Sequence, residues 1–389
     1  MFGQARATRL RLNLKSDPQI THGSERAARV EAIQTGAATG LLPVWNFQAI
    51  STRDGNIYAG SMVGANPTLN GPGVNVKVSA QVVPIILKLH TIGVRFNPNT
   101  GVITTVPGNT TMDPTVADNR CLARPNNMPV RLLQQSPILS NADFNFGGTD
   151  VGTTQATDAF QRGNFWQLID QDNYHVRLSP VVLPALVIDV PATRGLALSG
   201  SIFGACSPLG IVDINLIDAA VVQATLTRPR IGPNTFPMFM LYNSGMSIGN
   251  PFNLNNCCAG GYHGVNATSP VTFQTYAPFD FQTNGIFLNA DDTVIISHEA
   301  AEWMNDPYDV NPTPAWGHTG QVGGCQNNLE VGDPLTGTNA SPMVGKNGFT
   351  YHLQELAFYS WFYGAPSVGI HGWFSDNATF RTDAGPPCQ

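Results

Sequence analysis

His298, Glu299 and Glu302 are spaced so that they could bind a metal ion and use it for hydrolysis. Side chains four residues apart lie on one face of an α-helix, so His298 and Glu302 would point to the same place. This is the HExxH zinc motif with a glutamate in place of the second histidine. We therefore predict Zn²⁺ ligands at His298 and Glu302, and Glu299 as the general base that takes a proton from a metal-bound water.

The flanks of the motif favour a buried metal-binding helix over a solvated one. The alternative is an exposed helix end whose two glutamates simply face water. The flanking residues are apolar, however, and only 12% of the chain is charged, about half the usual share. Carboxylates in an apolar helix need a partner. A glutamate ligand also makes the site less selective for zinc, so another divalent ion such as calcium stays open.

A third ligand is expected downstream of this helix. Glu330 and Asp333 are the preferred candidates, and His318 and Asp306 also lie nearby in the sequence. Asp333 belongs to a Gly-Asp-Pro turn, which would hold its carboxylate in place. The alternative is that Glu330 and Asp333 only cap turns, a common use of acidic residues.

The elements that would position these residues can be read from hydrophobic periodicity and turn residues. Strands are predicted at 82–89, at 93–96 and 101–106 as a hairpin, within 176–190, at 236–242 and around 271–276. Helices are predicted at 155–169, 211–226 and 294–304, the last ended by Asn305-Asp306-Pro307. A residue before proline avoids the helical region, which explains that end. The segments from 107 to about 152 and around 245–290 read mainly as polar loops.

Composition limits the classes of function. Net charge is −6 and no basic run occurs, so nucleic acid is an unexpected partner. No run of about 18 apolar residues is present, so we expect no membrane-spanning helix. The six cysteines form no CxxC pair, which favours disulfides in a secreted protein. Adjacent Cys257 and Cys258 are expected to pair with different partners. Residues 1–6 lack an apolar signal core, so a secreted chain would start after a removed signal peptide.

The motif and its surroundings resemble a known pattern. Residues 298–307, followed by Trp316 and the Glu330–Asp333 turn, are similar to secreted bacterial putative metallopeptidases with an HExxE, DP and ExGD pattern. A related pattern occurs in the exordium-like (phosphate-induced) family, where a Gly-aromatic-His element precedes the helix; here it is Gly261-Tyr262-His263. The resemblance implies a zincin-like fold, and by analogy with gluzincins it favours Glu330 as third ligand.

From these observations we expect an α+β fold. It would be a zincin-like mixed sheet with a backing helix and an active-site helix, plus β-rich and loop-rich additions. Residues 1–75 are polar and rich in turns, so they are expected to form an N-terminal extension. Residues 76–389 would form the zincin-like metallohydrolase domain.

Two functions remain open at this stage. The first is a secreted metal-dependent hydrolase, a zinc peptidase acting on a peptide or protein substrate. The second is a secreted structural or surface-interaction protein whose metal site is non-catalytic or absent. The Gly-x-Ser-x-Gly string at 245–249 would suggest an esterase, but Asn250-Pro251 is a poor start for the helix that such a nucleophile requires.

Overall fold

The structure is a computed structural model that describes residues 10–15, 42–69, 74–269, 272–320, 322–338, 340–382 and 388. The strands are β1 (Val44–Ile50), β2 (Ile57–Val63), β3 (Asn75–Phe96), β4 (Ile103–Met112), β5 (Ala142–Phe146), β6 (Thr149–Thr154), β7 (His175–Val182), β8 (Leu186–Val190), β9 (Gly195–Leu198), β10 (Leu209–Asp213), β11 (Thr235–Tyr242), β12 (Ser244–Ser247), β13 (Gly264–Ser269), β14 (Thr272–Phe281), β15 (Pro312–Gly317), β16 (Cys325–Asn328), β17 (Ala340–Val344) and β18 (Thr350–Gln354). The α-helices are α2 (Pro129–Gln135), α3 (Ala156–Asn164), α4 (Ile214–Thr227), α5 (Val294–Asn305) and α6 (Tyr359–Tyr363).

The zincin-like α+β fold expected from the sequence is wrong. The described residues are mostly β-structure, with one large curled mixed sheet and few helices. Part of the error arises where a polar segment forms strands. The β5–β6 hairpin lies in a region that reads as loop, because each strand has only two buried residues. Such short, half-buried strands leave a weak signal in sequence.

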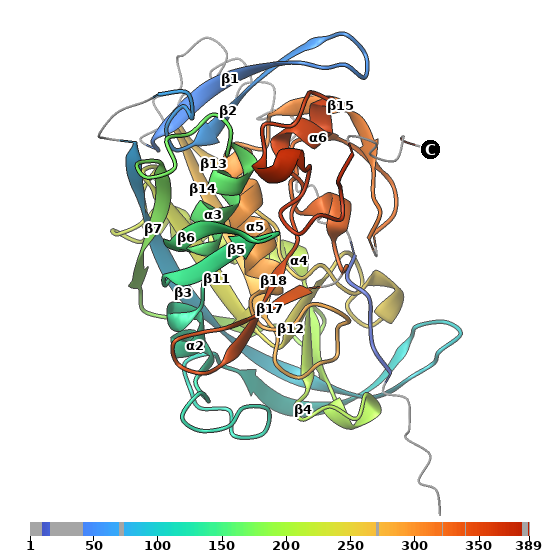
Figure 1. The fold of residues 1–389 in the computed structure, drawn as a ribbon. Helices are drawn as coiled ribbons and strands as arrows, with labels where there is room; N and C mark the ends of the chain where they lie inside the picture. The colour runs from blue at the N-terminus through green and yellow to red at the C-terminus, as the bar shows by residue number, and fades with distance from the viewer. Residues whose placement is uncertain are drawn as a thin grey trace, which may run out of the picture.

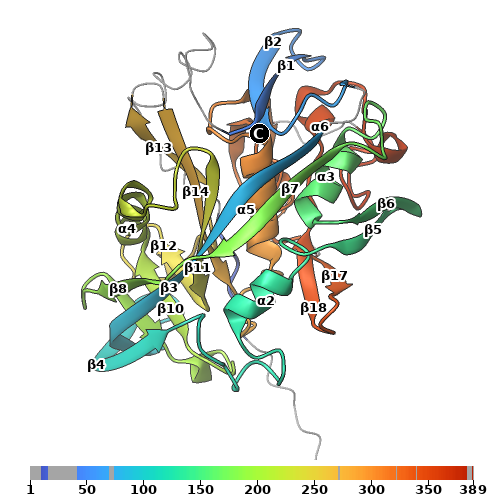
Figure 2. The same cartoon turned by 90° about the vertical axis from the view of Figure 1, so that its left-hand side faces the viewer.

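Strand β3 organises the large sheet. Its first half pairs in parallel with β7 and β11, and its second half pairs in parallel with β8 and antiparallel with β4. β11 in turn pairs in parallel with β14. The strands that pair with β3 therefore change along its length, as β3 crosses the molecule from the neighbourhood of β7 to that of β4 (Figure 2).

Helices cover both faces of this sheet, which explains the continuous apolar run at 235–242. Phe236, Met238 and Met240 belong to the core that includes α5, whereas Phe239 and Leu241 belong to the core that includes α4. Strands buried on both faces are apolar throughout rather than alternating. Figure 2 shows α4 on one side of the strands and α5 and α3 on the other.

Helix α5 lies at the centre of the molecule (Figure 1), and all twelve of its residues are buried. It packs against β14, β18, α3 and β2. The Trp303 ring stacks on Phe236 at a centroid distance of 3.9 Å, and its Nε1 donates to Thr275 Oγ1 at 2.9 Å. The predicted helix at 294–304 is confirmed, and its burial excludes the solvated alternative.

Other predicted elements are confirmed with shifted ends. The strands at 82–89 and 236–242 lie within β3 and β11, and the hairpin at 93–106 is the β3–β4 pair. The predicted helix at 155–169 ends at Asn164. The helix predicted from 211 begins at Ile214, because residues 209–213 form β10 and the Asp213 carboxylate accepts a hydrogen bond from the Asn215 backbone N–H at 2.9 Å.

The described part of residues 1–75 contains the β1–β2 hairpin. Leu42, Phe47, Met62 and Val63 pack into the same core as α5. The division into an extension of residues 1–75 and a domain of residues 76–389 stays a prediction.

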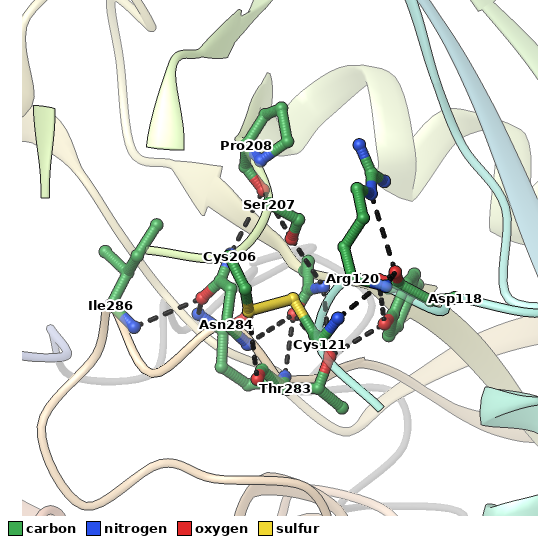
Figure 3. The surroundings of a disulfide bond; sticks show 12 residues. Asp118, Arg120, Cys121, Cys206, Ser207, Pro208, Thr283, Asn284 and Ile286 are labelled. Atoms are coloured by element: carbon green, nitrogen blue, oxygen red, sulfur yellow. Dashed lines mark hydrogen bonds and ion pairs between the residues drawn. A yellow bond between two sulfur atoms is a disulfide. The ribbon is translucent and has the colours of Figure 1, made fainter. Parts of the chain in front are cut away.

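All six cysteines are paired, as Cys121–Cys206, Cys257–Cys258 and Cys325–Cys388. The expectation that Cys257 and Cys258 pair with different partners is wrong, because the other four cysteines pair among themselves. Around Cys121–Cys206, the Asp118 carboxylate accepts from the Arg120 backbone N–H at 2.9 Å (Figure 3). No helix in the described part of the chain is long and apolar enough to cross a membrane.

A buried carboxyl at the end of β14 makes stability depend on pH. Burial raises the pKa of Asp280 well above its ordinary value of 3.8. The folded state therefore holds a proton that the unfolded state releases, so stability falls as pH rises above 3.8. We expect Asp280→Asn to be more stable than the parent at pH 7 by at least about 1.4 kcal/mol, because each unit by which folding raises a carboxyl pKa costs about that much above the ordinary pKa. The advantage should vanish below the ordinary pKa.

Urea unfolding at pH 3 and pH 7 measures this difference. The asparagine side chain of the Asp280→Asn variant retains an oxygen that can accept from the Ser244 backbone N–H, as Asp280 Oδ1 does at 2.8 Å. The substitution Asp172→Asn, at an exposed position, serves as the control and should change stability little at either pH. Equal stability of parent and Asp280→Asn at pH 7 would contradict the prediction.

Candidate metal centre

Three segments that are distant in sequence meet at one end of α5. The helix contributes His298, Glu299 and Glu302. His263 lies directly before β13, in the segment that runs beside β14. Glu330 and Asp333 belong to the turn between β16 and the 3₁₀ turn at Asp333–Leu335. His298 and His263 each have a ring nitrogen close to Glu302. Asp333 lies close to His298, and Glu330 lies close to His263.

The donor atoms form two groups that share Glu302. One holds His298, Glu302 and Asp333 and the other His263, Glu299 and Glu302, with the atoms of each group within 4.8 Å of one another. Nε2 of His298 lies 3.0 Å from Glu302 Oε2 and 3.6 Å from Asp333 Oδ1. Nδ1 of His263 lies 3.7 Å from the same Glu302 oxygen and 3.8 Å from Glu330 Oε2. Four ligands about 2.1 Å from a tetrahedral zinc ion lie about 3.4 Å from one another. The observed separations bracket that value.

Hydrogen bonds on the far side of each ring determine which nitrogen faces the cluster. Nδ1 of His298 lies 3.1 Å from Gln354 Oε1, and Nε2 of His263 lies 3.2 Å from the Asp306 carbonyl oxygen. Both oxygens can only accept, so those nitrogens carry the hydrogens. In the neutral rings the lone pairs of His298 Nε2 and His263 Nδ1 therefore face Glu302. Such a partner orients metal-binding histidines.

Glu302 joins the helix to the 330–333 turn. Its Oε1 accepts hydrogen bonds from the backbone N–H groups of Gly332, at 3.0 Å, and Asp333, at 3.1 Å. The Gln354 side-chain amide donates to the Gly332 carbonyl oxygen. This hydrogen bond keeps the other atom of the amide, Gln354 Oε1, facing His298. Residue 332 must be glycine, because a Cβ there would lie 2.5 Å from His298 Nδ1.

Glu299 lies on the His263 side of the cluster. Its carboxylate groups with a donor atom of His263 and one of Glu302, all within 4.8 Å of one another. A Cβ on Gly261 would lie 2.5 Å from Glu299 Oε1, so a glycine is needed for this approach. The residue predicted as general base is thus beside the candidate ligands but is not required to be one of them.

The charges of the cluster depend strongly on one another. Burial alone would raise the pKa of Glu302, but the His298 and His263 rings lower it to about 2. Burial would lower the pKa of His263, but nearby carboxylates, above all Glu302, raise it to about 9. Burial, followed by repulsion from Glu302, raises the pKa values of Glu330 and Asp333. With no cation present, protons must neutralise part of this cluster.

The remaining predicted candidates have other roles. Asp306 accepts hydrogen bonds from the backbone N–H groups of Val310 and Asn311, both at 2.9 Å, so it caps the turn after α5. One of its oxygens also lies near Asp309 and Glu330. His318 Nδ1 lies 3.0 Å from the Asp333 carbonyl oxygen, where it supports the 330–333 turn. Neither Asp306 nor His318 has a described contact with His298.

The residues present fit a divalent cation. Oε2 of Glu302 and Oε2 of Glu330 are buried without a hydrogen bond in the described structure. In the absence of a cation these oxygens are neutralised by protons, on the His263 ring and on Glu330 itself, and a divalent cation could take the place of those protons. One imidazole nitrogen with two carboxylate oxygens, as in the group of His298, Glu302 and Asp333, is a donor set for zinc or a similar transition metal.

His263 is the residue that the sequence argument did not place among the ligands. Its only signals were its position in the Gly-Tyr-His-Gly element and the glycines around it. The Gly-x-Ser-x-Gly string at 245–249 forms no nucleophile turn, because Ser247 is the buried last residue of β12 and residues 248–253 contain no helix.

Comparisons with protein-family models, with curated proteins and with solved structures found no match to this chain. The resemblance to putative metallopeptidases and to the exordium-like family therefore stays a prediction.

Gln354→Leu tests the orientation of His298. The substitution removes the acceptor for His298 Nδ1–H and the donor to the Gly332 carbonyl. Loss of such a partner lowers metal affinity about 10- to 100-fold. We expect a decrease of that size in Zn²⁺ affinity, measured by competition with a chromogenic chelator.

Gln155→Leu is the matched control. Gln155 is also buried and donates to two backbone carbonyls, those of Leu139 at 3.1 Å and Leu178 at 2.8 Å. This variant should lose stability and keep the parent's Zn²⁺ affinity. Equal affinities for parent and Gln354→Leu would show that Gln354 does not orient a ligand.

Proposed function

We propose that this protein is a secreted hydrolase that depends on a divalent metal ion and cleaves peptide bonds, with zinc as the ion. The observation that carries the proposal is the spacing of donor atoms around Glu302 Oε2, from 3.0 Å to 3.8 Å between neighbouring pairs. The hydrogen bonds of His298 Nδ1 and His263 Nε2 add to it, since they leave the other nitrogen of each ring facing Glu302 Oε2.

In this proposal each residue of the cluster has its own task. His298, Glu302 and Asp333 hold the ion, because their donor atoms all lie within 4.8 Å of one another, and His263 faces Glu302 from the other side. A bound divalent ion polarises a carbonyl and acidifies water. Glu299, beside His263 and Glu302, accepts the proton of the attacking water and later returns it to the leaving amine. Gly261 leaves room for the Glu299 carboxylate.

The substrate class and the location rest on other observations. A peptide or protein substrate follows from the resemblance of residues 298–333 to putative metallopeptidases. Secretion is consistent with the three disulfides, because such bonds persist in oxidising compartments.

A structural metal site is the second candidate, and the burial of the ligands favours it. His298 is 4% exposed, Glu302 0% and Asp333 1%. Structural zinc sites are closed, whereas catalytic sites keep one position open to water or substrate. Under this reading the ion stabilises the junction of α5 with the 330–333 turn, and Glu299 has no chemical role.

The test combines metal analysis with turnover. Purified protein is assayed for bound metals by mass spectrometry, and its melting temperature is measured with and without a chelator. Cleavage of a fluorogenic peptide library is measured before and after chelation, and after addition of Zn²⁺. Zinc-restored cleavage supports the hydrolase. A bound metal whose removal lowers the melting temperature, without cleavage of any peptide, supports the structural site.

A further inference from the structure

A cavity of about 180 Å³ lies beside the candidate metal centre. Ser297, which precedes His298, and Gln354, whose Oε1 faces His298 Nδ1, line its inner wall. Asn145 and Asn377 also line it and are exposed, so the cavity reaches the surface there. One layer of side chains thus separates the cavity from the ring of a candidate ligand.

The cavity has an apolar body. Phe144, Phe146, Phe160, Met343 and Leu353 line it. Its size is well below the roughly 300–1,000 Å³ of sites for drug-sized ligands. It therefore suits one long side chain better than a whole small molecule. Aromatic faces also attract cations as well as apolar groups.

The cavity has an acidic end. Glu355 and Asp376 both line it, and none of the described residues around it is basic. Glu355 is held in place by three hydrogen bonds, from Ser375 Oγ, the Thr379 backbone N–H and Thr379 Oγ1, at 2.6, 2.9 and 2.6 Å. Asp376 Oδ1 accepts from the Leu356 backbone N–H at 2.9 Å. Burial, and then the charge of Glu355, raises the pKa of Asp376 well above its ordinary value.

A cavity lined by apolar side chains and two carboxyl groups matches an apolar stem with a cationic head. Lysine and arginine side chains have this form: their methylene groups lie along apolar walls while the charged end reaches polar partners. A cationic head would allow Asp376, whose pKa is raised in the empty cavity, to ionise, and a neutral or acidic side chain would not.

We propose that this cavity binds a lysine or arginine side chain of the substrate, with Asp376 as the residue that selects the positive charge. The proposal rests on the proposed peptidase function for its occupant. It adds a substrate class to that function, since peptides with a basic residue near the scissile bond would be preferred.

The test measures binding separately from turnover. Peptides of the form acetyl-Ala-Ala-X-Ala-Ala-amide, with X as lysine, arginine, norleucine or glutamate, are titrated into the Glu299→Gln protein loaded with zinc. We expect lysine or arginine peptides to bind about 10- to 100-fold more tightly than the norleucine peptide, as for a hydrogen bond to a charged group. The glutamate peptide should bind least.

Asp376→Asn should abolish this preference, because asparagine keeps the acceptor for Leu356 N–H and removes the charge. Asp150→Asn, at an exposed position of the β5–β6 hairpin, is the matched control and should retain the preference. Butylammonium should compete with the lysine peptide, a result that does not depend on any variant. An equal affinity for lysine and norleucine peptides, or a preference that persists in Asp376→Asn, would overturn the proposal.

The outcome separates this inference from the proposed function. A basic preference in binding that Asp376→Asn removes, in a parent protein that cleaves nothing, would support the cavity and reject the peptidase. Cleavage by the parent with the same kcat/KM for lysine and norleucine peptides, together with equal binding, would support the peptidase and reject the cavity.

Discussion

Glu299→Gln is expected to lower peptide cleavage by about 10²- to 10⁴-fold, the usual contribution of a general base. Glutamine has nearly the same shape as glutamate but cannot accept a proton from water at neutral pH. The carboxylate lies within 4.8 Å of donor atoms of His263 and Glu302 and is 1% exposed. Its loss should therefore affect the proton transfer while the three ligand side chains stay in place.

The informative result is the combination of two measurements. Zinc content and chelator-dependent melting of Glu299→Gln should equal those of the parent, while kcat falls. The exposed substitution Asp150→Asn controls for the removal of one negative charge and should leave kcat unchanged. If Glu299→Gln loses zinc, Glu299 is a ligand rather than a base. If kcat is unchanged, the catalytic proposal is wrong and the structural metal site is favoured.

His298→Ala is expected to reduce bound zinc from one ion per chain to a small fraction. The side chain supplies the donor nearest to Glu302 Oε2, at 3.0 Å. Its removal also leaves the buried Glu302 carboxylate with one imidazole instead of two. Breaking a buried ion pair by removing one partner costs about 3–5 kcal/mol. We expect a loss of stability of that order, together with a melting temperature that no longer responds to a chelator.

His90→Ala is the matched control, because His90 is exposed and pairs with Asp189 and Asn109 at the surface. It should keep the zinc content and the chelator response. If His298→Ala does not fold, His298→Gln preserves more of the side-chain volume, and its zinc content decides the same question. A parent-like zinc content in both folded variants would place the ion elsewhere or nowhere.

His298→Ala and Glu299→Gln test different parts of the proposed function. His298→Ala asks whether the cluster binds an ion at all, and Glu299→Gln asks whether that ion is used for catalysis. Retained zinc affinity in Gln354→Leu would leave both proposals standing and would remove only the role assigned to the Gln354 amide. The cavity at Asp376 is tested by peptide binding rather than turnover, and that test requires only that the Glu299→Gln protein binds zinc.

Local sequence predicted the parts of the site that lie on one element. The four-residue spacing of His298 and Glu302 places them on one helix face, because an α-helix has about 3.6 residues per turn. The apolar flanks predicted a buried helix, and α5 is buried along its whole length. The β-branched run at 82–89 and the apolar run at 236–242 predicted strands for the same reason: each element's own period is visible in its residues.

Residues separated in the chain were placed by the tertiary structure alone. His263 approaches Glu302 because β13 and β14 pair beside α5, and no local pattern encodes that meeting. Asp333 reaches His298 because Glu302 binds the backbone of the turn, and Gly332 has no side chain to keep the two apart. Cys257 pairs with Cys258 rather than with a distant partner, since pairing depends on which sulfur atoms the fold brings together.

The sequence by itself therefore determined the helix, the two side chains that share one of its faces and the charge class of the protein. The β-rich architecture, the approach of His263 and Asp333 to that helix face and the acidic cavity were decided only by packing. The physical reason is that helical and strand periods act over a few residues, whereas loops reach a site through contacts between segments far apart in the chain.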